Sequence, residues 1–220
     1  MSRYSSQSRY SSQRERERES LESWVPKTKL GKLTVEGKIG DLHEAFELGY
    51  KIMEPEIVKT LLKDLTTEIV GVTVVQKQTD AGEVTKFRVI VATGNRNGWF
   101  GVGIGKAKTM RIAIDKATND ALLEIVPIEL GCGSWECKCN QPHSLPFKVE
   151  GKCGSVRVQM IPGPRGLGLV AGENVKKLLS LAGLKDVWTR TYGATSTYPS
   201  ITYAVYDSLK KVHILGHIRE

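Results

Sequence analysis

The sequence contains no hydrophobic run of the roughly 18 residues that a membrane-spanning helix requires. Its first residues are rich in Ser, Arg and Gln, unlike the apolar centre of a secretory signal. Only four cysteines occur in 220 residues. Without a signal peptide they favour reduced thiols or a metal site over disulfides. We therefore expect a cytoplasmic protein.

Sequence patterns typical of enzymes are equally scarce. No Ser, His and acidic residue gather around a nucleophile turn. The stretch GVGIGKA is comparable to a nucleotide-binding loop, but the residue five places before Gly105 is Phe100, and Ala107 stands where a Mg²⁺-binding hydroxyl is needed. A second glycine-rich loop, 162–172, has the spacing GxGxxxG and too little chain after it for a doubly wound sheet. We therefore expect no enzyme.

The charge of the chain is positive and unevenly distributed. The sequence carries 32 Lys and Arg against 24 Asp and Glu, a net charge of +8. Residues 84–118 and 141–220 each have an excess of six positive charges, whereas 119–140 between them have an excess of three negative charges. This pattern is typical of two modules that touch the same polyanionic partner.

The first part of the chain changes character at Trp24. Before it, SRYSSQ occurs twice in succession and Arg alternates with Glu, so no apolar surface offsets the entropy of ordering. We expect a disordered arm, either a dispensable tail or a segment that RNA orders. The stretch WVPKTKLGKL predicts an extended basic segment, and 41–49 a short helix that ends at Gly49.

Residues 54–126 predict the order α-β-β-β-α. A helix begins at Pro55, and β-branched residues indicate strands over 68–76 and 83–93. The turn Asn97-Gly98 precedes a third strand. The next helix, from about 107 to 125, has an apolar stripe at helical spacing. The stripe consists of Met110, Ala113, Ile114, Ala117, Ala121 and Ile125.

The second half predicts the order β-β-α-β-α. Strands are expected over 146–150, 155–161 and 186–191, and helices over 173–182 and 199–212. The last helix turns a single apolar face inward. That face consists of Ile201, Ala204, Val205, Leu209 and Val212. The expected fold class is therefore α+β with two domains.

The most distinctive stretch is Gly94 to Lys108, GNRNGWFGVGIGKAK. Its five glycines would let the backbone approach a bulky polyanion closely. We expect Lys106 and Lys108 at the start of the following helix, where free N–H groups and the helix dipole favour a phosphate. The sequence therefore predicts a phosphate-binding loop.

This stretch, together with GCGSWECKCNQPHSLPFKVEGKCGSVRVQMIPGPRGLGLVAGENVKKLLSLAGLKDVWTRTYG, closely resembles the small-subunit ribosomal protein five family. The GSWEC segment resembles the archaeal form, and the similarity runs from about Trp24 to Leu209. The resemblance implies a double-stranded-RNA-binding-like first domain and a second domain of the family's domain-two type. The repeated SRYSSQ arm departs from the family, so no role is transferred to it.

The resemblance also implies a function. A member of this family binds small-subunit ribosomal RNA between head and body and contacts ribosomal protein four. It contributes to translational accuracy, and it lies beside proteins three and four along the path by which messenger RNA enters. Composition and resemblance together give the expected regions: a disordered arm over 1–22, a basic extended segment and short helix over 23–53, the RNA-binding-like domain over 54–130, a Cys-rich hinge over 131–145 and the C-terminal domain over 146–220.

Candidate RNA-binding residues combine cations for phosphates, amides for 2′-hydroxyls and one ring for stacking. They are Lys27, Lys29, Lys32, Arg88, Asn95, Arg96, Asn97, Trp99, Lys106, Lys108, Arg111, Lys116, Arg165, Lys176 and Lys177. The alternative for the cations is a solvated surface or a protein neighbour. The alternative for Trp99 is a place in the core or at its rim.

The cysteines form a compact pattern. Cys132, Cys137, Cys139 and His143 offer four zinc ligands within twelve residues, with Cys153 as a substitute. The alternative is that small thiols fill space between the domains. The family requires no cofactor, so zinc follows from the spacing alone. Two further functions compete with the ribosomal one: a free regulatory protein that binds double-stranded RNA, and a metal-dependent enzyme with Glu136 as its base.

Overall fold

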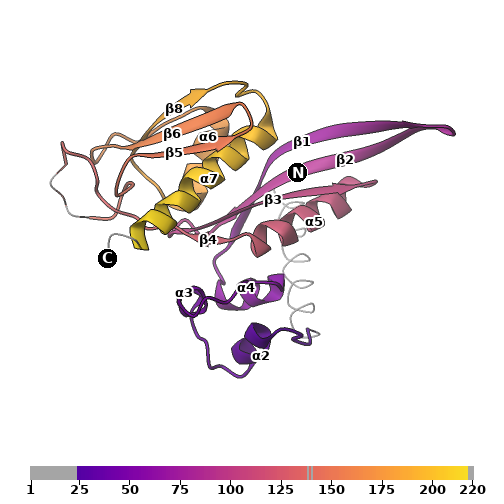
Figure 1. Ribbon diagram of the computed structural model, residues 1–220, viewed down its shortest axis with the longest axis horizontal. Coiled ribbons are helices and arrows are strands. Elements are labelled where there is room, and N and C mark those ends of the chain that lie inside the picture. Colours follow the sequence, from indigo (N-terminus) through magenta and orange to yellow (C-terminus); the bar gives the residue numbers. More distant parts are fainter. Residues whose placement is uncertain (1–23, 138, 140, 218–220) are drawn as a thin grey trace, which may run out of the picture. The chain divides into compact units, whose positions relative to one another are not determined.

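The computed structural model of the chain describes residues 24–137, 139 and 141–217 (Figure 1). The predicted disordered arm lies outside the described residues. The chain divides into two compact units, Met1–Lys63 and Asp64–Glu220.

The described part of the first unit consists of short helices. They are α2 (Lys29–Val35), α3 (Leu42–Glu47) and α4 (Pro55–Leu61). The predicted helices over 41–49 and from Pro55 are confirmed, but the extended segment predicted over 24–33 is wrong from Lys29 onward, where α2 begins. The Thr28 hydroxyl accepts a hydrogen bond from the Gly31 N–H at 3.1 Å, so it caps α2 and starts a helix after Pro26.

The second unit begins with a four-stranded antiparallel sheet of order β1-β2-β3-β4. Its strands are β1 (Thr66–Thr79), β2 (Gly82–Gly94), β3 (Trp99–Ala107) and β4 (Val126–Pro127). The two-residue β4 is too short to leave a sequence pattern. The predicted order α-β-β-β-α is otherwise confirmed, with α5 (Met110–Leu123) as its last helix.

Helix α5 lies against one face of β2 and β3. Gly101, Gly103 and Gly105 alternate along β3 on this face, and a Cβ atom on any of them would overlap the backbone of α5. Ala113, Ala117 and Ala121 supply equally small surfaces on the helix, and all are fully buried. The predicted apolar stripe is wrong at Met110, which is 43% exposed because it lies at the first residue of the helix.

A second sheet has the order β5-β6-β8-β7, with β7 and β8 parallel and the other pairs antiparallel. Its strands are β5 (Val149–Cys153), β6 (Val156–Pro162), β7 (Leu169–Val170) and β8 (Val187–Tyr192). The helices are α6 (Glu173–Ala182), which ends at the left-handed Gly183, and α7 (Tyr198–His217). The predicted order β-β-α-β-α is confirmed, with β7 as a short addition inside the glycine-rich loop.

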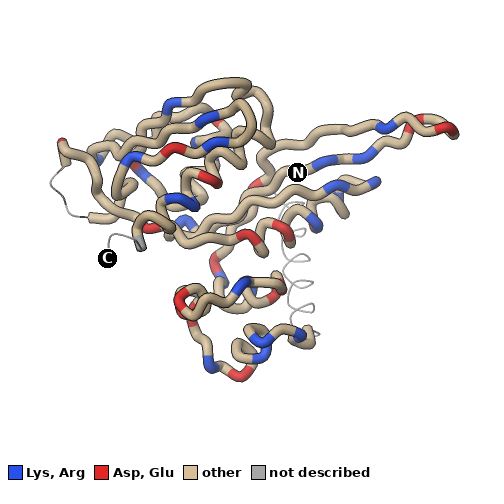
Figure 2. The backbone as a smooth tube through the Cα atoms, viewed as in Figure 1, with Lys and Arg blue, Asp and Glu red and all other residues tan. Residues whose placement is uncertain are grey.

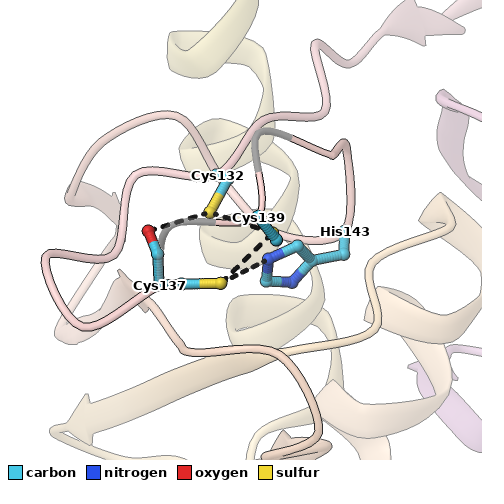
Figure 3. A group of neighbouring side chains, drawn as sticks. All are labelled: Cys132, Cys137, Cys139 and His143. Carbon is cyan, nitrogen blue, oxygen red and sulfur yellow. Dashed lines mark hydrogen bonds between the residues drawn. The ribbon is translucent and has the colours of Figure 1, made fainter.

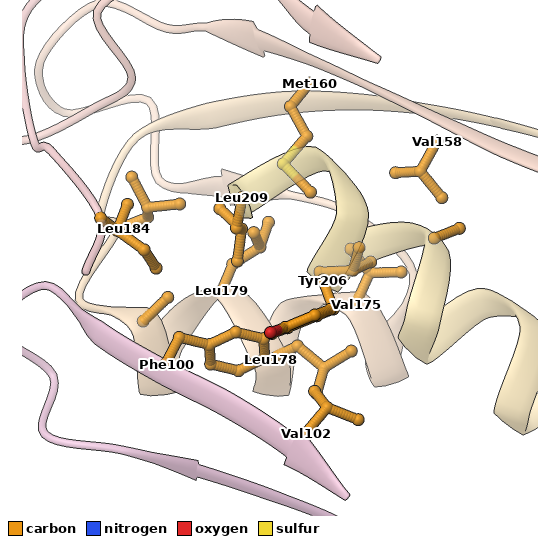
Figure 4. Packing of buried hydrophobic residues seen from close by; sticks show 14 of the residues in the cluster. Phe100, Val102, Val158, Met160, Val175, Leu178, Leu179, Leu184, Tyr206 and Leu209 are labelled. Atoms are coloured by element: carbon orange, nitrogen blue, oxygen red, sulfur yellow. The ribbon is translucent and has the colours of Figure 1, made fainter. Parts of the chain in front are cut away.

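The two sheets share one hydrophobic core, because α6 and α7 lie between them (Figures 1 and 4). Phe100 and Val102 of β3 meet Leu178 of α6, and on the far side of the helices Val158 and Met160 of β6 complete the cluster. The layers of this unit are therefore α5, the first sheet, the helix pair and the second sheet. The α+β fold class is confirmed, while the finer division at 130 and 145 stays a prediction.

Candidate functional site

The turn between β2 and β3 is closed by its own polar groups. The Asn95 side-chain oxygen accepts hydrogen bonds from the backbone N–H groups of Asn97 at 2.8 Å and Trp99 at 3.0 Å. The Arg96 N–H donates to the carbonyl of Leu181 at the end of α6. The side-chain oxygen of Asn95 is therefore hydrogen-bonded within the protein, whereas the side chains of Arg96 and Asn97 are exposed to solvent.

The rest of the Gly94–Lys108 stretch is not the phosphate-binding loop that its sequence suggests. Its three strand glycines are covered by α5, so no polyanion can approach them from that side. Trp99 is 4% exposed at the start of β3, opposite Pro127 of β4, so the structure agrees with the alternative of a place in the core and not with stacking on a base.

The lysines of this stretch also lie elsewhere than predicted. Lys106 belongs to β3, where it pairs with Arg88 of β2, and Lys108 precedes the N-cap Thr109. The placement of both at the start of α5 is therefore wrong. The strand continues to Ala107, three residues beyond its predicted end at Ile104, because Ala107 is buried against α5 with the preceding glycines.

The predicted RNA-binding cations do not form one surface. Arg88 and Lys106 lie on the face of the first sheet away from α5, and the Arg88 Nε donates to Thr73 at 3.1 Å. Arg111 and Lys116 are exposed on α5, on the opposite side. Figure 2 shows Lys and Arg distributed over several elements of the chain.

The remaining cations fall on three separate elements. Lys27, Lys29 and Lys32 are exposed at the start of the first unit and on α2. Arg165 is exposed in the loop before β7. On α6, Lys176 and Lys177 are exposed, and Lys177 forms an ion pair with Glu173 at 2.9 Å.

Sequence reasoning missed the outer face of the second sheet. There Lys152, Arg157 and Tyr192 lie in one row across β5, β6 and β8, and Arg190 pairs with Gln159 in the next row. The two cations of these central strands are exposed, Tyr192 is 50% exposed, and Trp188 on the same face of β8 is 45% exposed. The opposite face of the same strands carries the core.

A shallow hollow lies on this outer face. It is lined by Glu150, Ser155, Arg157, Gln159, Tyr192 and Gly193. The Gln159 amide donates to the Glu150 carboxylate at 2.8 Å. The alternation of apolar residues with Arg157 and Gln159 in β6 could have indicated this face, because it predicts that these polar side chains point away from the core. It does not predict the neighbouring residues that line the hollow with them.

The four predicted metal ligands come together (Figure 3). The ligand atoms of Cys132, Cys137, Cys139 and His143 all lie within 4.8 Å of one another. The Cys139 sulfur is 3.5 Å from that of Cys132 and 3.1 Å from that of Cys137, and the His143 Nε2 is 3.6 Å from Cys137 Sγ. The fourth cysteine, Cys153, lies in β5 against the core, so it is not a substitute ligand.

His143 is held by a buried carboxylate. Its Nδ1 lies 2.9 Å from Asp186 Oδ2, and both side chains are more than nine-tenths buried. A carboxylate only accepts, so Nδ1 must carry the proton of this bond and Nε2 presents its lone pair toward the thiols. The segment is fixed further by paired backbone hydrogen bonds between Gly131 and Ser144.

The thiols of the cluster differ in their protonation. Hydrogen bonds from Cys139 and from the backbone N–H of Arg165 lower the pKa of Cys137 to about 6. Burial and the neighbouring thiols raise the pKa of Cys132 to about 11. A thiolate at Cys137 at neutral pH is suited to binding a soft cation.

Comparison with known proteins identifies the family. The family models "Ribosomal protein S5, N-terminal domain" and "Ribosomal protein S5, C-terminal domain" match residues 65–129 and 151–218. "Small ribosomal subunit protein uS5" of Thermofilum pendens is 54% identical over 190 residues, which are 86% of this chain and 94% of the relative. The protein of the same name from Cenarchaeum symbiosum is 54% identical over 203 residues, 92% of this chain and 93% of the relative. The chain belongs to the uS5 family.

Membership of the uS5 family confirms the resemblance found in the sequence, including its archaeal character. It also agrees with the prediction that the chain is not an enzyme. In the described part of this uS5 chain, no helix has both the length and the apolar character needed to span a bilayer. The cysteine cluster lies between the two family domains, in a segment that neither family model covers.

Proposed function

We propose that this uS5 chain is a cytoplasmic structural constituent of the small ribosomal subunit that binds its RNA and neighbouring proteins by shape and charge. The observation that carries the proposal is the identity of about half of all positions with proteins named for that subunit, over most of both chains. The positive net charge of +8 and its exposed Lys and Arg agree with a polyanionic partner.

The outer face of the second sheet is the proposed RNA-binding surface of the C-terminal half. Arg157 and Arg190 are placed to pair with phosphates, and the exposed rings of Trp188 and Tyr192 can stack on unpaired bases. Cations interleaved with aromatic rings on an open sheet suit single-stranded or looped RNA, because every base has a face that stacks. The hollow beside Tyr192 would take such a base.

The proposed location in the subunit, the protein partners and the effect on accuracy are based on the family resemblance. They are binding between head and body, contact with ribosomal proteins four and three, an effect on translational accuracy and a position along the path by which messenger RNA enters. Arg96 and Asn97, exposed on the turn that closes on α6, are the candidates for RNA contact at the junction of the two halves.

Paired double variants test the RNA-binding surface. Arg157→Ala with Arg190→Ala and Arg111→Ala with Lys116→Ala remove the same charge, from the second sheet and from α5. We expect the first pair to weaken binding of small-subunit ribosomal RNA more, and to reduce the log–log salt slope by about one unit per lost phosphate contact. Filter binding across salt concentrations gives both values. If both double variants lose the same affinity for RNA, the second sheet contributes only long-range electrostatic attraction and is not a binding surface.

A free regulatory protein that binds double-stranded RNA is the competing function. Sucrose-gradient sedimentation of a cell extract separates the two. A subunit constituent co-sediments with small subunits through a high-salt wash, whereas a free regulator stays near the top of the gradient.

The proposal includes one structural zinc ion held by Cys132, Cys137, Cys139 and His143. In a tetrahedral site with Zn–S distances of about 2.3 Å, neighbouring sulfurs are separated by about 3.8 Å. The observed sulfur–sulfur separations of 3.5 Å and 3.1 Å are shorter than this value, so the side chains would move slightly apart to complete the site. Four protein ligands leave no open position, which favours a structural ion over a metal-dependent enzyme that uses Glu136.

Metal analysis of purified, chelator-washed protein tests the zinc site. We expect one zinc per chain and a lower melting temperature after removal of the ion. Cys137→Ser should lose the metal, and Cys153→Ser is the matched control that should retain it. Zinc well below one per chain, with an unchanged melting temperature, would exclude the site.

A further inference from the structure

The metal-ligand cluster is connected to the glycine-rich loop that carries Arg165. His143 donates to one oxygen of the Asp186 carboxylate, and the other oxygen accepts hydrogen bonds from the backbone N–H groups of Gly166 at 3.1 Å and Gly168 at 2.8 Å. Asp186 is 5% exposed, so this chain of hydrogen bonds is shielded from water. One carboxylate thus links a metal ligand to two points of the loop.

A second connection reaches the loop from the residue after His143. The Ser144 hydroxyl accepts a hydrogen bond from the backbone N–H of Gly163, the first residue of the loop, at 3.2 Å. The segment that carries the ligand His143 is therefore hydrogen-bonded to the loop at Gly163 and, through Asp186, at Gly166 and Gly168.

Backbone hydrogen bonds at Gly163, Leu167 and Gly168 also hold the loop, but two of its glycines carry an entropic cost of ordering that the bonds to Asp186 offset. Gly166 and Gly168 both have left-handed backbone conformations, with φ of 89° and 76°. Glycine loses more conformational freedom on ordering than other residues. The Arg165 side chain meanwhile points into solvent.

We infer that zinc at Cys132, Cys137, Cys139 and His143 positions the 163–168 loop so that Arg165 is preorganised for an RNA phosphate. This inference rests on the proposed zinc site and RNA-binding function. In the proposed arrangement the zinc ion does not itself contact RNA. The ion lowers the entropic cost that the loop would otherwise incur on binding.

Hydrogen exchange of the full-length protein tests the first step. In the zinc-loaded protein, the amides of Gly166 and Gly168 should exchange about tenfold more slowly than after chelation. Amides of β6 and α7 report whether the fold is intact, and should change little. Zinc binding with unchanged exchange in the loop would overturn the inference and leave the zinc site standing. Absence of zinc binding would overturn both.

The dependence of RNA affinity on zinc tests the second step. Chelation should weaken binding of small-subunit ribosomal RNA by wild-type protein about three- to tenfold, in line with the entropic cost of ordering one flexible side chain on binding. The same treatment should have no effect on the Arg165→Ala protein, because the contact that zinc supports is already absent. An equal effect of chelation on both proteins would contradict the role of Arg165. The control Lys185→Ala, an exposed cation outside the loop, should behave as wild type.

Discussion

Single residues in this chain show that a glycine-rich pattern can serve packing as well as ligand binding. Gly101, Gly103 and Gly105 resemble a phosphate-binding loop in sequence, but their alternation matches the face of β3 that meets α5. The absence of side chains there lets strand and helix backbones approach closely, which is a general use of glycine inside a strand. Lys106 of the same stretch lies on the other face of the strand, away from α5.

Replacing Gly103 with Ala should destabilise the protein by about 1–3 kcal/mol, because the new methyl group would overlap the α5 backbone. Gly40→Ala is the control, since a Cβ atom there meets nothing within 4 Å, the residue is exposed and it lies outside the helices. Chemical denaturation gives both values. If Gly103→Ala is as stable as the control but binds RNA more weakly, the glycines serve the ligand and not the packing.

Glu54 of the first unit should make the stability of the protein depend on pH. The Glu54 carboxylate accepts hydrogen bonds from the N–H groups of Lys27 at 2.9 Å and Thr28 at 2.8 Å. Partial burial opposes ionisation, but these bonds outweigh it and lower the pKa of Glu54 below its usual 4.5. The stabilisation is therefore present above pH 4.5 and is lost as pH falls through the lower pKa of the folded state.

Glu54→Ala should accordingly destabilise the protein at pH 7 by on the order of 1 kcal/mol and have a smaller effect at pH 3. Unfolding of wild type and variant, measured at several pH values, gives the difference directly. A difference that stays constant from pH 7 to pH 3 would show that the charge of Glu54 contributes nothing.

At the scale of elements, α2 depends on its first residues. The Thr28 hydroxyl is the cap that the sequence interpretation overlooked, and only seven residues follow in the helix. A helix this short gains little from propensity alone. Its capping bond and the buried side chain of Leu30 therefore carry much of its stability.

Thr28→Ala should cost about 1 kcal/mol and reduce helicity in the first unit, whereas Thr28→Ser keeps the capping oxygen and should be nearly neutral. Amide exchange of Gly31, whose N–H loses its partner, would locate the effect. Equal stability of the Ala and Ser variants would show that the cap does not matter.

Elements with a long, regular pattern could be predicted from the sequence. The inner face of α7 and the Gly183 end of α6 were both read from spacing and residue type, and the structure confirms them. The orientation of Trp99 could not be predicted, because it depends on a two-residue partner strand at Pro127. The cysteine spacing predicted the four ligands, but Asp186 lies 43 residues beyond His143 and only the fold brings them together.

At the scale of the molecule, the shared core decides which surfaces of the second unit remain for partners. Because α6 and α7 fill the space between the sheets, the face that each sheet turns toward these helices is buried. The outer face of the second sheet stays open and carries Arg157, Arg190 and two exposed rings. We therefore expect the RNA contacts of the C-terminal half on this face and on the Arg165 loop beside the cluster.

Ultraviolet crosslinking of assembled small subunits, followed by mass spectrometry, tests this account most directly. We predict nucleotides attached to peptides of β6 and β8, with Trp188 or Tyr192 as crosslinked side chains, and loss of these crosslinks when Arg157 and Arg190 are replaced together by Ala. Assembled subunits in which these peptides carry no nucleotide, while peptides of α5 do, would contradict the proposed RNA-binding surface.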